Sequence, residues 1–127
     1  MRIQSAKELT VYRKAFDLAM RIYELSKQFP PEERFALTSQ IRRSSRSVCL
    51  NLREAWAKRR YEAHFVSKLT DADGESNETD TALDFACKCG FIPEAIHAEL
   101  VALNSEVRKM LGSIIENPNS FLIDRDD

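Results

Sequence analysis

The side chains best suited to chemistry in this sequence are the arginines and lysines between residues 34 and 60. This stretch has eight basic residues and one acidic residue, Glu54. At about 100° per residue of a helix, three further arginines fall within roughly 40° of Arg42, namely Arg46, Arg53 and Arg60. Guanidinium groups at this spacing can follow a phosphate backbone, because each presents a planar fork of N–H donors. The candidate nucleic-acid-binding residues are Arg42, Arg43, Arg46, Arg53, Lys58, Arg59 and Arg60.

Charge is distributed unevenly along the chain, although the net charge is only −1. Residues 1–69 carry 15 Lys and Arg against 7 Asp and Glu, whereas residues 70–127 carry 4 against 13. A basic half suggests an anionic partner such as nucleic acid. The same pattern suits two halves that fold back and neutralise each other, within one subunit or between subunits. Composition alone leaves both interpretations open.

A helical projection places two rows of carboxylates on the acidic half. One row consists of Asp71, Glu75 and Glu78, and the other of Asp73, Asp80 and Asp84. If this segment forms a hairpin with the arginine-rich one, one row lies near the arginines and the other faces solvent or another subunit. Exposed ion pairs contribute only about 0–1 kcal/mol, so such pairing would set register and partner choice more than stability.

The motifs that suggest catalysis or metal binding are incomplete. Glu75 and Glu78 have the ExxE spacing of helical Mg²⁺-dependent nucleotide pyrophosphohydrolases, but such a site also needs inward carboxylates from a second helix. Glu94 and His97 have the ExxH spacing of di-iron bundles, which need that motif twice. No GxSxG elbow or Gly-rich phosphate loop occurs. We therefore predict no catalytic residue, no metal site and no cofactor, with the nucleotide hydrolase as a less favoured alternative.

Size and composition predict one domain without a membrane partner. The chain has 127 residues, of which 43% are hydrophobic, and no apolar run approaches the roughly 20 residues of a membrane span. Residues 1–10 are polar and lack the apolar core of a signal peptide, so we expect a cytoplasmic protein. Cys49, Cys87 and Cys89 contain no CxxC pair and are expected to be small buried hydrophobic residues.

Apolar residues recur every three or four positions, which predicts helices throughout. The helices are expected at about residues 10–28, 38–59, 61–89 and 93–116, with a helical turn at Pro31-Glu32-Glu33. Thr10 and Thr38 are the expected N-caps of the first two helices, and Gly90 ends the third. Short links between such helices predict an all-α, up-down-up-down antiparallel four-helix bundle. It forms one domain over residues 1–127, with its core at about 9–116 and a tail at 117–127.

The third helix has the weakest signal in the sequence. Residues 71–80 are rich in Asp, Gly, Asn and Thr, which lower helix propensity, so a loop over 70–81 is the alternative. Small and apolar residues stay in phase across it and favour one unbroken helix, namely Phe65, Leu69, Ala72, Ser76, Thr79, Leu83 and Ala86. The second helix also has small side chains on several sides, at Ser44, Ser45, Ser47 and Cys49. Such side chains let neighbouring helices approach closely, which suggests close packing and oligomerisation.

Several blocks of sequence together carry a family resemblance over about residues 9–115. They are Leu9-x-Val11-Tyr12-x-x-Ala15 followed by Ile22-Tyr23, Phe29-Pro30-x-x-Glu33-Arg34-Phe35-Ala36-Leu37-Thr38-Ser39-Gln40-Ile41-Arg42-Arg43-Ser44, Ser47-Val48-x-x-Asn51-Leu52-x-Glu54-Ala55, Leu69-x-x-Ala72-x-Gly74-x-x-x-Glu78-Thr79 and Gly90-Phe91-Ile92. The chain resembles the bacterial four-helix-bundle family of proteins encoded in intervening sequences of large-subunit ribosomal RNA genes. The accessory variability determinants of diversity-generating retroelements are more distantly similar. Ala55 and Glu75 depart from the pattern, which commonly has Gly and Ser at these positions.

The resemblance implies a ring-like homopentamer with no established enzymatic activity. Its retroelement members imply engagement of nucleic acid and of a reverse transcriptase. Our first hypothesis is accordingly a non-catalytic oligomeric bundle that binds RNA or DNA through the basic residues of the second helix. The alternative is a protein–protein scaffold, for example for a reverse transcriptase, in which those arginines are already paired with carboxylates.

Overall fold

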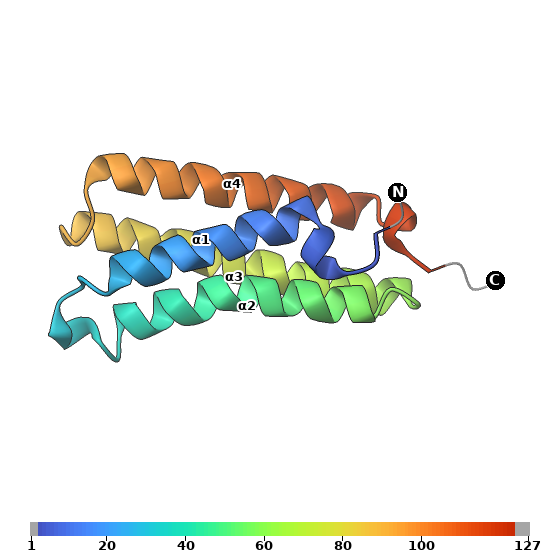
Figure 1. The fold of residues 1–127 in the computed structure, drawn as a ribbon, viewed down its shortest axis with the longest axis horizontal. Helices are drawn as coiled ribbons and strands as arrows, with labels where there is room; N and C mark the ends of the chain where they lie inside the picture. Colours follow the sequence, from blue (N-terminus) through green and yellow to red (C-terminus); the bar gives the residue numbers. More distant parts are fainter. Residues whose placement is uncertain (1–2, 124–127) are drawn as a thin grey trace.

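Four long α-helices lie side by side along the long axis of the molecule (Figure 1). The computed structural model describes residues 3–123, and this part of the chain contains no β-strand. The helices are α1 (Thr10–Ser26), α2 (Leu37–Ala57), α3 (Glu62–Lys88) and α4 (Glu94–Glu116). Three short 3-10 turns accompany them, namely η1 (Ala6–Glu8), η2 (Pro31–Glu33) and η3 (Asn119–Phe121). The predicted all-α class with four helices is therefore confirmed.

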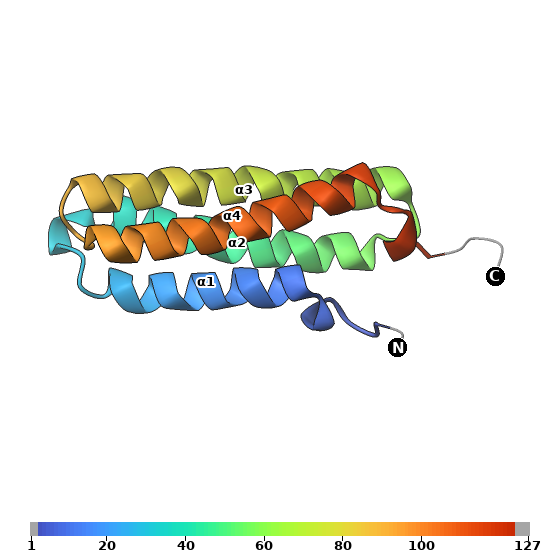
Figure 2. The same cartoon turned by 90° about the horizontal axis from the view of Figure 1, so that it is seen from above.

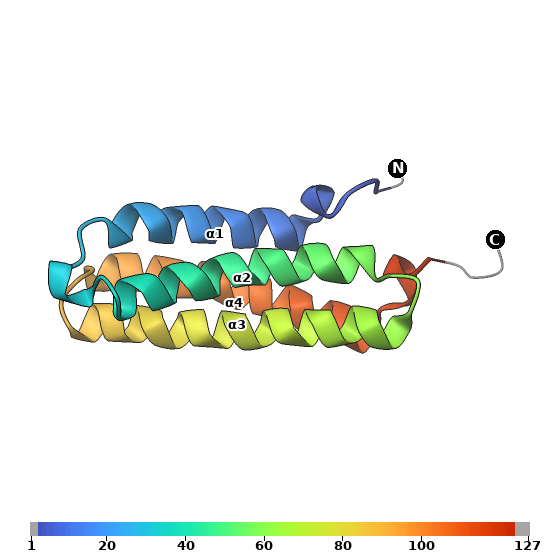
Figure 3. The ribbon, with the colours of Figure 1, turned by 90° about the horizontal axis from the view of Figure 1, so that it is seen from below.

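The links between successive helices alternate between the two ends of the molecule. The α1–α2 link, which contains η2, lies at the same end as the α3–α4 link, and the α2–α3 link lies at the other (Figures 1 and 3). Both α2 and α4 contact α1 and α3, so α1 and α3 are diagonal neighbours in the bundle (Figure 2). Helix α2 therefore has one edge against α1 and the other against α3. Among the described residues, no helix is long and apolar enough to cross a membrane.

The helices begin close to their predicted starts, but both predicted N-caps are wrong. Thr10 and Thr38 lie inside α1 and α2, and the N-cap positions are taken by Leu9 and Ala36, neither of which makes a side-chain cap hydrogen bond. Glu33 of η2 supplies an acceptor for the start of α2, because its Oε1 accepts a 3.2 Å hydrogen bond from the first N–H of that helix. The turn before α2 thus does the capping that the threonine was expected to do.

Helix α3 is unbroken through the stretch rich in acids and small residues, as the phase of its apolar positions predicted. All seven residues expected to stay in phase are buried, namely Phe65, Leu69, Ala72, Ser76, Thr79, Leu83 and Ala86. Gly74 lies on the exposed side, where an added Cβ would meet nothing within 4 Å. Gly90 follows the helix with a φ of 79°, a left-handed conformation that disfavours side chains with a Cβ. Packing of the buried face thus outweighs the weak helix propensity of residues 71–80.

Two apolar clusters fill the interior of the bundle. The cluster at the end with η1 and η3 includes Leu52 and Leu111, and the cluster at the other end includes Leu83 and Leu100. Each of these four side chains is no more than 1% exposed. Full burial of a large aliphatic side chain contributes about 1.5–3 kcal/mol, so the two clusters supply most of the force that holds the helices together.

A layer of buried polar side chains separates the two clusters along α2, α3 and α4. The hydroxyls of Ser44 and Thr79 lie 2.9 Å apart where α2 meets α3. Ser76 donates to Asn104 Oδ1 at 2.8 Å, and Asn104 Nδ2 donates to the Ser76 carbonyl at 3.0 Å. These hydrogen bonds satisfy groups that would be costly to bury unpaired, so they fix the register of α3 against both neighbours. Ser44 and Ser45 are buried, in agreement with the close packing predicted for the serines of α2.

The chain after α4 packs against the core instead of leaving it at residue 116. Phe121 of η3 stacks on Phe65 with ring centroids 6.4 Å apart, and Leu122 packs on the same apolar cluster. The predicted tail covered residues 117–127, and residues 124–127 lie outside the described part of the chain. Apolar contacts therefore extend the core past its predicted limit.

The prediction of three buried cysteines is wrong. Cys49 on α2 is buried, but Cys87 is half-buried and Cys89 is exposed. Cys87 packs at the margin of the apolar cluster that includes Leu83 and Leu100, and Cys89 lies just past the last residue of α3. Burial raises the pKa of the Cys49 thiol to about 11, which keeps it protonated near neutral pH.

Candidate nucleic-acid interface

The arginines of α2 divide between its two edges, and two of those on the α1 side contact an aromatic ring. The guanidinium of Arg42 lies 4.9 Å from the centroid of Tyr23, and its Nε donates to Ser26 Oγ at 2.7 Å. One turn further along α2, the guanidinium of Arg46 lies 5.4 Å from the same ring. Lys27 Nζ also approaches this ring, at 4.8 Å. Cation–π contacts at exposed sites contribute about 0.5–1 kcal/mol without neutralising the cation, so this edge of α2 keeps its charge.

On the α3 side of α2, Arg43 is paired with carboxylates. Its guanidinium forms ion pairs with Glu78 and, at 3.1 Å, with Glu75. The hydrogen bond to Glu75 is the main cause that raises the pKa of Arg43, and the charges of both carboxylates add to it. The acidic row that includes these two residues therefore faces α2, as the hairpin interpretation proposed. Arg43 was predicted to bind nucleic acid, but its charge is neutralised within the chain.

A second set of ion pairs continues this edge toward the end of α2. Lys68 Nζ lies 3.0 Å from Glu54 Oε2 and 3.6 Å from Asp71 Oδ2. The hydrogen bond between Lys68 and Glu54 lowers the pKa of Glu54 and raises the pKa of Lys68. The ion pairs at the contact between α2 and α3 join two cations to four carboxylates, so this edge carries no excess of positive charge.

By helical geometry, the row of arginines on the α1 side continues to Arg53. This residue follows Arg42 by eleven positions, which is about 16 Å along a helix. It is exposed and forms no ion pair within residues 3–123. Lys58, at the C-cap of α2, is also exposed, and its charge contributes to the lowered pKa of Glu54. Within the described part of the chain, no carboxylate binds Arg42, Arg46 or Arg53.

The last two predicted binding residues lie beyond α2 and do not continue its row. The helix ends at Ala57, so Arg59 and Arg60 belong to the link to α3, which corrects the expected end of the helix near residue 59. The guanidinium of Arg59 folds back over the Trp56 ring, 3.5 Å from its centroid, and its Nε donates to the Trp56 carbonyl at 2.8 Å. This arginine therefore covers the end of α2 instead of extending along its face.

A depression of about 520 Å³ lies on the outer face of α2 beside Arg42 and Arg46. Its lining includes Arg34, Phe35 and Leu50, which the prediction of site residues left out. Phe35 is 88% exposed and Leu50 is 63% exposed, the highest fractions among large apolar side chains of the described chain. The guanidinium of Arg34 lies 5.2 Å from the Phe35 ring. The sequence contains one signal for these residues. Phe35 stands next to Arg34 and falls outside the apolar period of both α1 and α2.

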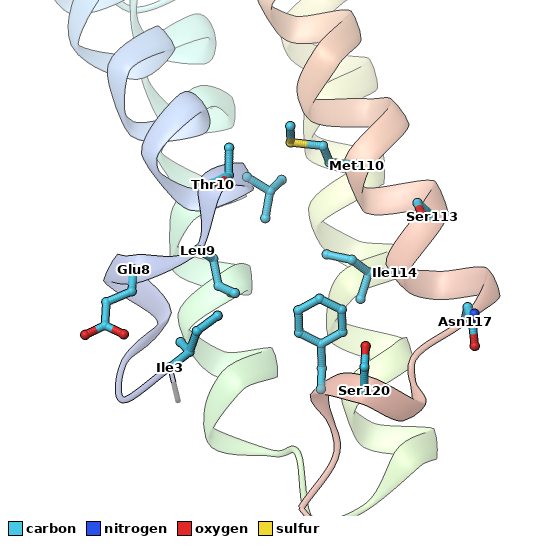
Figure 4. A pocket seen from close by; sticks show the side chains of 11 residues that line it. Ile3, Glu8, Leu9, Thr10, Met110, Ser113, Ile114, Asn117 and Ser120 are labelled. Atoms are coloured by element: carbon cyan, nitrogen blue, oxygen red, sulfur yellow. The ribbon is translucent and has the colours of Figure 1, made fainter. Parts of the chain in front are cut away.

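Another cleft, of about 470 Å³, lies between the start of α1 and the end of α4 (Figure 4). Apolar side chains such as Leu9, Met110 and Ile114 line much of it. Among residues 3–123, Glu8 is the only charged residue that lines it, and this carboxylate accepts a 2.9 Å hydrogen bond from the Gln4 N–H. A general acid–base mechanism needs a second group that can hold or release a proton, and this lining does not offer one.

The ExxE pair of α3 is occupied by a side chain of the same protein. Both Glu75 and Glu78 bind Arg43, so a divalent cation at this position would have to displace a guanidinium. Residues 3–123 contain no group of three or more His, Cys, Asp or Glu side chains placed to hold a metal ion. His97 Nε2 lies 2.8 Å from Asp84 Oδ1 and links α4 to α3, which is a structural hydrogen bond between helices.

Comparisons with known proteins agree with the fold and with the predicted family. The chain is similar to a crystal structure described as a protein with unknown function from the S23 ribosomal protein family of Bacteroides thetaiotaomicron VPI-5482. The two share 32% sequence identity with a TM-score of 0.76, and the alignment covers 84% of this chain and 96% of that chain. No curated protein matches the sequence. The likeness to the accessory variability determinants stays a prediction.

The assignment to a family rests on most of the helical core. A family model described as the 23S rRNA-intervening sequence protein matches residues 7–113, a range that runs from η1 to near the end of α4. This range includes both edges of α2, the buried polar layer and the resemblance blocks read from the sequence. The chain therefore belongs to the family of 23S rRNA-intervening sequence proteins.

Proposed function

We propose that this protein is a non-catalytic helical bundle that binds RNA or DNA through the α1-side arginines of α2, namely Arg42, Arg46 and Arg53. The observation that carries the proposal is that no carboxylate of the described chain binds any of these three guanidinium groups. Arg42 and Arg46 are instead held by Tyr23 and Ser26, which orient them without cancelling their charge. We include Lys58, at the C-cap of α2, and Arg59 and Arg60, in the link that follows, in the proposed surface. We also propose that the protein is cytoplasmic.

The chemistry of this edge suits phosphate more than it suits carboxylates of the same protein. Each guanidinium retains N–H donors, and two of them are pre-oriented by the ring beneath, so less side-chain freedom is lost when they bind. The row from Arg42 to Arg53 spans about 16 Å, a length that several successive phosphates can occupy. Such contacts position a nucleic acid without reading its sequence, so we propose binding with little sequence preference.

The test is a comparison of two triple variants with equal changes of charge. The first removes the open arginines, in Arg42→Gln, Arg46→Gln and Arg53→Gln. The second removes cations that are already paired with carboxylates on other faces, in Lys14→Gln, Arg21→Gln and Arg108→Gln. Fluorescence anisotropy with labelled RNA and DNA oligonucleotides, over a range of salt concentrations, gives the affinity and its salt dependence.

We expect the first variant to lose most of the affinity at moderate salt. Each phosphate contact on a single strand contributes about 0.7 to the slope of log affinity against log salt, so the slope should fall by about 2. The second variant should keep most of the wild-type slope of log affinity against log salt, because the cations that it lacks are bound in internal ion pairs in the wild type. Equal losses in the two variants would show that only net charge matters and would contradict the assignment to this edge.

We propose that the bundle, with its helices in up-down-up-down order, is also the unit of a ring-like homo-oligomer such as a homopentamer. An exposed apolar stripe on α1 favours self-association, because Phe16 is 50% exposed and Met20 is 46% exposed. Tyr12 stacks on Phe16 with centroids 6.1 Å apart and extends the stripe. Large exposed apolar patches commonly mark protein interfaces. A partner such as a reverse transcriptase would be an alternative occupant of this surface.

Mass measurement in solution by light scattering tests the assembly. We expect Phe16→Ser with Met20→Ser to give monomers, and Arg46→Glu with Arg53→Glu to leave the mass unchanged. Monomers from the arginine reversal would instead support the scaffold alternative, in which these arginines join subunits. The proposed absence of enzymatic activity predicts no turnover of nucleoside triphosphates with Mg²⁺ or Mn²⁺.

A further inference from the structure

We infer that the depression on α2 binds unpaired nucleotides, with Phe35 stacked on a base and Arg42 and Arg46 on the phosphates beside it. This inference rests on the proposed function and specifies the form of the nucleic acid as single-stranded RNA or DNA instead of duplex. The observation behind it is that an almost fully exposed aromatic ring lines the same depression as guanidinium groups that no carboxylate binds.

The ring of Phe35 makes no contribution to the core. It belongs to neither apolar cluster, and the ring contact made by this residue within the described chain is with the guanidinium of Arg34. Phe29, six residues earlier in the same link, shows what a structural phenylalanine does here. It is 8% exposed and packs on Phe91 with ring centroids 5.6 Å apart. The packing of the core therefore does not account for the position of the Phe35 ring, and a ligand that stacks on the ring would account for it.

The combination of ring and cations selects for unpaired bases. In a duplex the faces of the bases are covered by their neighbours, so a protein ring on the surface has nothing to stack on. In a single strand the bases can splay out, and stacking on an aromatic side chain adds to phosphate contacts made by nearby arginines. Arg34 places a further guanidinium beside the ring. Leu50, which is 63% exposed in the same depression, offers apolar surface for a neighbouring base or sugar.

A polyanion fits this depression better than a second copy of the chain does. Among residues 3–123, its lining contains four arginines and no acidic residue, and three of these arginines, Arg34, Arg42 and Arg46, form no ion pair. Centres of protein–protein interfaces are depleted in charged residues, and burying this many guanidinium groups would need matching acids from the partner. Phosphates supply the missing negative charge directly.

The experiment uses the full chain and short RNA and DNA oligonucleotides of equal length, each as a single strand and as a blunt duplex. Binding is measured by fluorescence anisotropy for the wild type, Phe35→Ala, Phe35→Trp and the control Phe85→Ala. Phe85 is 59% exposed on α3, so its removal matches the loss of an exposed ring away from the depression. A single strand containing 5-iodouracil, cross-linked by ultraviolet light and mapped by mass spectrometry, reports the residue in contact with a base.

We expect the wild type to prefer single strands over duplex. Phe35→Ala should bind single strands about tenfold more weakly, the effect of removing one base–aromatic stack, and duplex as before. Its salt slope should stay unchanged, because the phosphate contacts remain. Phe35→Trp should bind at least as tightly as the wild type, Phe85→Ala should match the wild type, and the cross-link should map to Phe35. The ribose and deoxyribose arms show which sugar is preferred.

Three other results would overturn the inference, and they separate it from the proposed function. If Phe35→Ala binds single strands normally while the triple arginine variant does not, the α1 edge of α2 contacts only the phosphate backbone of the nucleic acid. The proposed function then still holds. If the wild type binds neither form, both proposals fall. If Phe35→Ala lowers the mass in light scattering and leaves single-strand affinity unchanged, the ring belongs to a contact between copies of the chain.

Discussion

The two edges of α2 carry the same kind of side chain in opposite electrostatic surroundings. Arg43 faces α3 and is bound by Glu75 and Glu78. Arg42, one residue earlier, faces α1 and lies over Tyr23. One position along a helix is about 100° of rotation, which is enough to move a guanidinium from one neighbouring helix to the other. Whether the charge of an arginine is neutralised depends on the side chains of the neighbouring helix. These are carboxylates on α3 and an aromatic ring on α1.

This difference separates the structural charges of the bundle from the ones available to a ligand. On the α3 edge, ion pairs and the buried hydroxyl pair of Ser44 and Thr79 hold two helices in one register. On the α1 edge, contact with Tyr23 orients Arg42 and Arg46 but leaves their charge uncompensated. A count of basic residues therefore overstates the binding surface, because part of that charge is used inside the fold.

The largest predicted effect concerns the buried hydroxyl pair that fixes the α3 edge. Thr79→Val keeps the volume of the side chain but removes the hydroxyl 2.9 Å from Ser44 Oγ. The Ser44 hydroxyl would then keep only the Ile41 carbonyl, at 3.4 Å, in a fully buried position. Leaving a buried polar group poorly satisfied costs about 1–3 kcal/mol. We expect a loss of this size in the free energy of unfolding, measured by urea denaturation.

The matched control removes both hydroxyls together. Ser44→Ala combined with Thr79→Val leaves no unpaired polar group at this position, so we expect the double variant to recover much of the lost stability. A double variant less stable than Thr79→Val alone would show that the pair does not act as a unit. In either variant the affinity for nucleic acid should change little, because the α1 edge is not touched.

An intermediate effect is expected when Arg43 is released from its carboxylates. Glu75→Gln with Glu78→Gln would convert the α3 edge into a second open edge. We expect single-stranded oligonucleotides to bind several-fold more tightly, with the salt slope larger by about 0.7 for one added phosphate contact. Stability should change by only about 0–1 kcal/mol, since these ion pairs are partly exposed.

The control for this gain removes the same amount of negative charge elsewhere. Glu99→Gln with Glu106→Gln takes away the partners of Arg21 and Lys14 on the α1 and α4 side of the bundle. We expect a smaller change in affinity, with the salt slope near that of the wild type. If this variant gains as much as the α3 variant does, the overall charge of the protein governs binding and the contrast between the edges of α2 has no role.

The helices and their buried faces were predictable because burial imposes a period on the sequence. The in-phase residues of α3, from Phe65 to Ala86, identify its inner face even though residues 71–80 have weak helix propensity. The N-caps were not predictable from residue type alone. Thr38 has the right chemistry, but the carboxylate of Glu33 in η2 reaches the first N–H of α2 instead. That outcome depends on the path of the link between α1 and α2, and this link has no repeating apolar pattern from which its path could be predicted.

The candidate site could be predicted only in part. The arginine row follows from helical geometry, and the approach of one acidic row follows from the hairpin. Tyr23 occupies a position in the apolar stripe of α1, so the sequence alone predicts that it faces the core. Its contact with Arg42 could therefore not be predicted. Phe35 lies between two elements, so its exposure depends on a link whose direction no local pattern specifies.

The smallest predicted effect concerns the acid sensitivity of the α3 edge. Lys68 lowers the pKa of Glu54 below its ordinary value of 4.5. A carboxyl group whose pKa is lower in the folded state stabilises the fold above its unfolded pKa, and this contribution disappears as the pH falls through the folded pKa. In Lys68→Met, carbon NMR of the carboxyl group should show the pKa of Glu54 returning toward 4.5, with a slightly flatter loss of stability on acidification. Arg42→Gln should leave that acid profile unchanged, because no carboxylate of the described chain binds Arg42. An altered profile in Arg42→Gln would mean that a carboxylate reaches the α1 edge in solution, and the two edges of α2 would then differ in degree only.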